Sequence, residues 1–107
     1  MADDIEEPPA DRRARIGVRD NARKSHYEAV LDDQVIGILL YRRQPGTLEL
    51  THTVTDPEHR REGAASVLVR TALAEARAQQ LQIVVVCPFV ENWLQRHPEQ
   101  SEGVVRY

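Results

Sequence analysis

Cys87 and His52 are the residues best suited by type to covalent or proton-transfer chemistry. A thiol can take an acyl group or protonate a departing thiolate, and an imidazole can remove a proton from an ammonium group near neutral pH. Each also has a structural interpretation. A lone cysteine is often a small buried hydrophobe, and a histidine on an apolar strand face is often a core residue. Residue type alone leaves both interpretations open at each position.

A third candidate site is a turn that could bind an anion. It consists of Arg60, Arg61, Glu62, Gly63, Ala64, Ala65 and Ser66. Unpaired N–H groups and partial positive charge at a helix N-terminus attract phosphate, and small side chains leave those groups accessible. The two arginines can add charge-assisted bonds. No Gly-Lys-Ser/Thr follows and only one glycine is present, which excludes a Walker A loop and a GxGxxG fingerprint. Alternatively, the segment only starts a helix and its arginines are solvated.

Three antiparallel strands are expected to precede this segment, over 25–31, 35–41 and 47–55, because apolar residues alternate between turn signals. One face of the third strand would carry Leu48, Leu50, His52 and Val54, and the other Glu49, Thr51 and Thr53. On that second face, Glu49 is a further candidate base acting through water, or simply a solvated carboxylate.

An alanine-rich amphipathic helix is expected to follow the segment and reach Gln80, with an apolar stripe formed by Ala65, Leu68, Val69, Ala72, Leu73 and Ala76. A short strand over 83–86, buried on both faces, and a short helix over 89–96 would come next. The last strand would lie parallel to the third, with the long helix as the right-handed crossover. The fold class is therefore α+β: a mixed, mostly antiparallel sheet with one long and one short helix.

The length of 107 residues supports one domain. Residues 1–15 are acidic, contain two prolines and lack a hydrophobic period, so we expect a disordered leader before a domain over 16–107. A net charge of −3 argues against nucleic acid as a partner. The longest apolar run, 35–41, is too short to cross a bilayer, and the leader does not read as a secretory signal. We expect a cytoplasmic monomer with no membrane partner.

Metal and disulfide chemistry are not expected. Cys87 is the only cysteine, which excludes an internal disulfide and any CxxC-type zinc or redox site. His52, Cys87 and a further histidine have suitable types for zinc, but no pair has a short zinc-ligand spacing.

Residues 60–65 resemble the Arg/Gln-x-x-Gly-x-Gly/Ala signature of the GNAT acetyltransferase superfamily. The order of further motifs is similar to that of small single-domain GNAT-like proteins: His52-Thr53, the glycine segment, Ala74-Glu75-Ala76-Arg77, Cys87-Pro88-Phe89-Val90 and Arg96-His97-Pro98. The resemblance runs from about residue 18 to residue 105. It implies a reduced GNAT (acyl-CoA N-acyltransferase) fold that lacks the usual two helices after the first strand and the closing C-terminal strands.

The resemblance also implies an acetyl-CoA-dependent N-acetyltransferase, whose partners are CoA and a small-molecule or protein amine. The pyrophosphate would bind at residues 60–66, and the pantetheine arm would bond to the backbone of Thr53, Val54 and Thr55. Cys87 would protonate the leaving thiolate or carry the acetyl group, and His52 would act as the base through water. Two alternatives remain: a CoA or acyl-CoA-binding module without transfer activity, and an interaction domain that binds no nucleotide.

Overall fold

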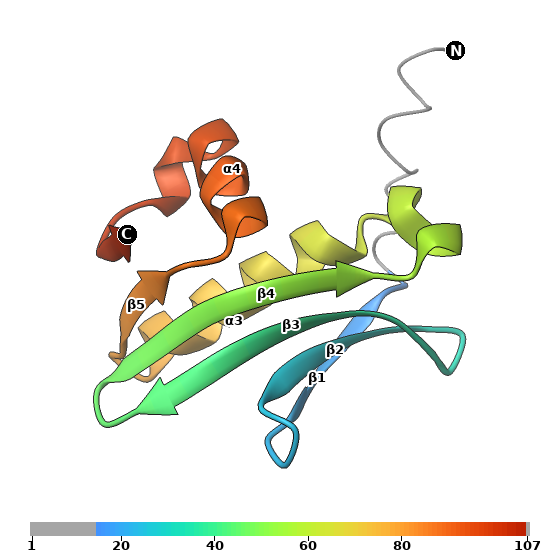
Figure 1. Ribbon diagram of the computed structural model, residues 1–107, viewed down its shortest axis with the longest axis horizontal. Helices are drawn as coiled ribbons and strands as arrows, with labels where there is room; N and C mark the ends of the chain where they lie inside the picture. Colours follow the sequence, from blue (N-terminus) through green and yellow to red (C-terminus); the bar gives the residue numbers. More distant parts are fainter. Residues whose placement is uncertain (1–14, 107) are drawn as a thin grey trace.

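A computed structural model describes residues 15–106, and the leader expected over 1–15 falls, except for Arg15, outside the described residues. Six strands form one sheet in the order of the chain (Figure 1). They are β1 (Gly17–Asn21), β2 (His26–Leu31), β3 (Gln34–Gln44), β4 (Thr47–Thr55), β5 (Gln82–Val85) and β6 (Val104–Arg106). β1 to β4 are antiparallel, whereas β4–β5 and β5–β6 are parallel. The expected mixed sheet, and the parallel pairing of the strand after the long helix, are confirmed.

The two outermost strands were not expected. Only one of the five residues of β1, Val18, is apolar, so the strand shows no alternation of apolar and polar residues. Hydrogen bonds from the Arg19 and Asn21 side chains to the Glu28 carboxylate hold β1 on β2. β6 has three residues, too few to show a period, and its presence corrects the expectation that closing C-terminal strands are lacking. Turns of residues 22–25 and 32–33 join β1 to β2 and β2 to β3, which leaves no length for a helix there.

Within residues 15–106, two α-helices pack with the sheet. α3 (Ala64–Ala78) follows β4 through a 3-10 segment, η1 (Pro57–Glu62), and α4 (Pro88–Arg96) follows β5. A second 3-10 turn, η2 (Pro98–Gln100), leads to β6. α3 runs along one face of the sheet, and α4 lies beyond the end of β5 (Figure 1). The buried stripe of α3 matches the expected one except that Ala64 replaces Ala65; it is Ala64, Leu68, Val69, Ala72, Leu73 and Ala76.

Gly37 of β3 lies where the start of α3 packs against the end of β4. A Cβ atom at Gly37 would stand 3.4 Å from the Val54 carbonyl oxygen and 3.5 Å from Ala64 Cβ. Both are ordinary contact distances, so the first turn of α3 and the end of β4, which carry candidate residues, lie close together at this point.

A β-bulge in β4 changes the face on which His52 lies. Tyr41 pairs with Leu50 and Leu40 pairs with His52, so Thr51 is an extra residue in the ladder. An extra residue interrupts the alternation of side chains. Thr53, paired with the fully buried Leu39, consequently lies on the core face, while His52 and Val54 lie on the outer face. The expectation that His52 and Val54 share a face with Leu48 and Leu50 is therefore wrong.

Candidate functional site

β4 and β5 separate beside the bulge. Their pairing ends at Leu50 and Val85, and the N–H groups of Val86 and Cys87 both donate to the Leu50 carbonyl oxygen, at 3.0 and 3.1 Å. From residue 51 to 55, β4 has a strand partner only in β3 within the described part of the chain. The edge that faced β5 is thus open to an extended ligand, which can bond to a strand edge as another strand would. Thr53, Val54 and Thr55 lie in this open part.

Cys87 lies at the point of separation and faces Thr53. Cys87 is the N-cap residue of α4 and is 2% exposed. Its Sγ atom lies 3.3 Å from Thr53 Oγ1, and either atom can be the hydrogen-bond donor. The structure therefore brings two of the candidate residues together, and it does so through the Thr53 side chain, for which the sequence had suggested only a backbone role.

The other proposed catalytic residue, His52, does not join this pair. Because of the bulge it lies on the opposite face from Thr53, in line with Leu40 of β3 and His26 of β2. His52 is exposed, so the alternative interpretation of a core histidine is wrong as well. Any proton transfer between His52 and a group at Cys87 would have to pass around or between the strands, through water.

The first turn of α3 presents backbone N–H groups with no side chain capping them. Its N-cap residue, Gly63, has φ 88° and ψ 12°, the left-handed conformation that glycine adopts without strain. No side chain makes a capping bond and no acidic residue stands in the first turn. The helix start that contains Ala64, Ala65 and Ser66 is consequently suited to an anion. Arg60, Arg61 and Glu62 belong to η1, and their side chains lie outside the described part.

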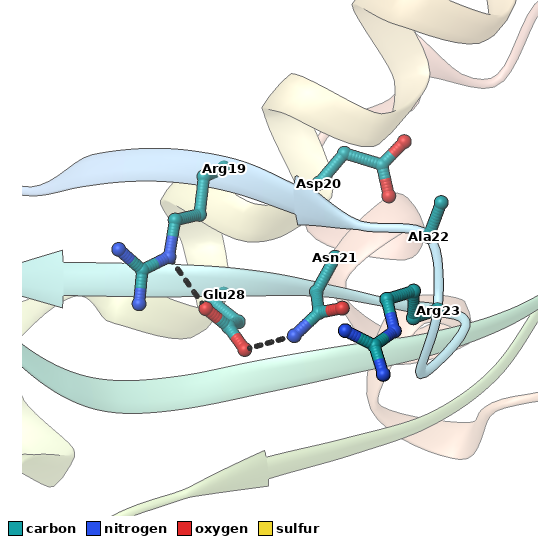
Figure 2. A pocket seen from close by; sticks show the side chains of 6 residues that line it. All are labelled: Arg19, Asp20, Asn21, Ala22, Arg23 and Glu28. Carbon is teal, nitrogen blue, oxygen red and sulfur yellow. Dashed lines mark hydrogen bonds and ion pairs between the residues drawn. The ribbon is translucent and has the colours of Figure 1, made fainter.

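A pocket elsewhere, at the β1–β2 turn, is built around a buried carboxylate (Figure 2). It is lined by Arg19, Asp20, Asn21, Ala22, Arg23 and Glu28. Glu28 accepts bonds from Arg19 Nε (2.6 Å) and Asn21 Nδ2 (3.0 Å), and His26 Nε2 lies 2.9 Å away. The Asn21 bond, followed by those of Arg19 and His26, lowers the pKa of Glu28 from 4.5 to about 2. Since its oxygens are already bonded, Glu28 acts structurally, tying β1 to β2.

Among the described residues, no three His, Cys, Asp or Glu side chains are grouped so that they could hold a metal ion. No helix in residues 15–106 has the length and apolar character needed to span a membrane.

Comparison with known proteins gives a family and a fold. Residues 26–103 match the family model described as GCN5-related N-acetyl-transferase. No curated protein matches the sequence. A GCN5-like protein from Staphylococcus aureus has a similar solution structure, with a TM-score of 0.62 at 13% identity over 88% of this chain and 92% of that one. This likeness shows that the two share a fold over nearly their whole lengths.

Two other solved structures match smaller parts. Ard1 from Thermoplasma volcanium has a TM-score of 0.49 at 22% identity, over 55% of this chain and 40% of that one. An acetyltransferase from Vibrio fischeri has a TM-score of 0.47 at 22% identity, over 58% and 59%. The chain thus spans well under half the length of the Thermoplasma protein.

Proposed function

The chain belongs to the GCN5-related N-acetyltransferase family, and from this premise we propose that it transfers the acetyl group of acetyl-CoA to an amine. The observation that supports the proposal best is the separation of β4 from β5 directly beside the uncapped start of α3. An extended arm and a diphosphate need these two features next to each other. Cys87 lies where β4 and β5 begin to separate.

The residues present fit CoA in two stretches. The backbone N–H groups around Ala64, Ala65 and Ser66 would hold the diphosphate, since the first turn of α3 has neither a cap nor an acidic side chain to compete. The open edge of β4 at 53–55 would bond to the amides of the pantetheine arm. Arg60 and Arg61 supply two cations in the segment immediately before α3.

The reaction requires two proton movements. Acetyl-CoA supplies an activated thioester; the amine nitrogen forms a bond to the carbonyl carbon, the C–S bond breaks, the amine loses a proton and the departing thiolate gains one. In our proposal the Cys87 thiol, held by the Thr53 hydroxyl, gives its proton to the thiolate. His52 takes the proton of the amine through water, from the opposite face of β4.

Cys87 supports a second route. The thiol can lose its proton, take the acetyl group on Sγ and pass it to the amine, after which the thiol is restored. The two routes differ in one observable. Only the relay leaves an acetylated Cys87 when acetyl-CoA is added without any amine, which intact mass spectrometry detects.

One observation favours a second candidate function, a CoA-binding module without transfer activity. Cys87 is 2% exposed, which also suits a thiol that only packs in the core. The two functions are separated by measuring CoA formation chromatographically, with an amine panel, for the wild type and for Cys87→Ala. Turnover that Cys87→Ala loses while still binding CoA supports the transferase. CoA binding without turnover for any amine supports the module.

A further inference from the structure

Trp93 of α4 is bonded to Ser66 of α3, although 27 residues separate them in the sequence. The indole Nε1–H donates to Ser66 Oγ at 3.0 Å, and Trp93 is 1% exposed. The ring stacks on His97 with centroids 4.1 Å apart, and the guanidinium carbon of Arg70 lies 5.1 Å from its centroid. These contacts fix the orientation of the indole, and therefore the direction of its N–H group.

The bond restricts what the Ser66 hydroxyl can do. A hydroxyl has one proton to donate and two acceptor positions. Trp93 occupies one acceptor position, so the hydroxyl proton points away from the indole and is available to another acceptor. Ser66 is the third residue of α3, within the uncapped first turn where we propose that the diphosphate binds. A phosphate oxygen there is an acceptor for that proton.

Without the indole N–H, a different geometry competes. A serine in a helix readily turns its hydroxyl back to the carbonyl of the preceding turn. That rotation would withdraw the hydroxyl from the ligand and use its proton within the helix. The Trp93 bond offsets this tendency, because it keeps the serine oxygen directed at α4.

We propose that Trp93 is a positioning residue for the cosubstrate: its indole N–H holds Ser66 so that the Ser66 hydroxyl donates to the diphosphate of CoA. The inference rests on the proposed function, since it needs CoA at the start of α3. The Trp93–Ser66 bond also bears on the position of the Cys87 thiol. α4 begins immediately after Cys87, so the Trp93–Ser66 bond ties the helix that carries the thiol to the helix that holds the diphosphate.

A double-mutant cycle tests the proposal by calorimetric titration of CoA and of pantetheine, which lacks the diphosphate. Trp93→Phe removes the N–H but keeps a ring, and Ser66→Ala removes the hydroxyl. We expect Ser66→Ala to weaken CoA about tenfold and Trp93→Phe about fivefold, with the double variant no weaker than Ser66→Ala. Ser66→Thr should keep near-wild-type affinity, and pantetheine affinity should be unchanged throughout.

A second measurement needs no variant. Trp93 is the only tryptophan, so one indole N–H signal in the ¹H–¹⁵N spectrum reports on it alone. The signal should shift with CoA and stay in place with pantetheine. Additive losses in the cycle, or an indole signal that moves equally with both ligands, would overturn this inference alone. A wild-type protein that binds no CoA would overturn the proposed function with it.

Discussion

Replacement of Glu28 by glutamine should destabilise the protein more at neutral pH than in acid. Among the described residues Glu28 is the one buried charged side chain, 7% exposed, and it receives bonds from Arg19, Asn21 and His26. Glutamine has almost the same shape but no charge, and its amide nitrogen cannot accept the bond that one carboxylate oxygen accepts. The change therefore measures how much the ionised carboxylate contributes to the free energy of unfolding.

The magnitude follows from the pKa of Glu28, which folding lowers from 4.5 to about 2. A difference of about 2.5 pKa units corresponds to between about 3 and 4 kcal/mol at about 1.4 kcal/mol per unit. The Arg19 side chain is 65% exposed and its contribution is screened, which reduces the expected loss to about 2 kcal/mol. Because the folded pKa is the lower one, this stabilisation is complete above pH 4.5 and is lost as pH falls towards 2.

Urea unfolding at pH 7 and pH 3 tests both the size of the loss and its dependence on pH. Glu28→Gln should lower the free energy of unfolding by about 2 kcal/mol at pH 7 and by less than half of that at pH 3. Glu49→Gln is the matched control, a carboxylate on β4 of the same sheet, which β3 separates from β2, and it should change stability by less than about 0.5 kcal/mol at either pH. Equal losses for Glu28→Gln at the two pH values would refute the assignment of its stabilising effect to the ionised form.

Three further substitutions test the candidate site. Gly63→Val should lower the free energy of unfolding in urea by about 1–2 kcal/mol, because φ at this position is 88°. The same variant should bind CoA more weakly in a titration, and unchanged affinity would count against the helix start as the diphosphate site. Gly37→Ala should leave the start of α3 in place and CoA affinity near the wild-type value, because a Cβ there would stand at ordinary contact distances of 3.4 Å from the Val54 carbonyl oxygen and 3.5 Å from Ala64 Cβ; a several-fold loss of affinity would contradict this. Thr53→Val should reduce acetyl transfer about tenfold with CoA affinity within twofold, and Thr53→Ser should restore the rate. Full activity in Thr53→Val would remove the hydroxyl from the mechanism.

Local patterns were sufficient for much of the fold. The stripe from Leu68 to Ala76 predicts α3 because its five apolar residues recur at the spacing that places them on one face of a helix. The β-branched run predicts the buried strand correctly at Ile83, Val84 and Val85, but the expectation that Val86 belongs to it is wrong, because Val86 follows the end of β5 and is 45% exposed. A helix of this length before the strand favours parallel pairing with β4.

Features that depend on contacts distant in sequence could not be predicted. The bulge at Thr51 leaves the alternation of residue types intact while reversing the face of His52, so the pattern pointed to the wrong side. β6 depends on contacts remote in sequence, because Arg77 of α3 donates to the carbonyl oxygens of Gln100 and Glu102 just before it. The same holds for the Trp93–Ser66 bond, which no spacing in the sequence announces.

The central claim is that CoA binds along the open edge of β4 and at the start of α3. Titration of CoA into ¹⁵N-labelled protein, followed by amide shifts, tests it most directly. The account predicts shifts concentrated at residues 53–55 and 63–66, with little change at the Glu28 pocket. An unchanged spectrum at the highest soluble CoA concentration, or shifts confined to the β1–β2 turn, would contradict it.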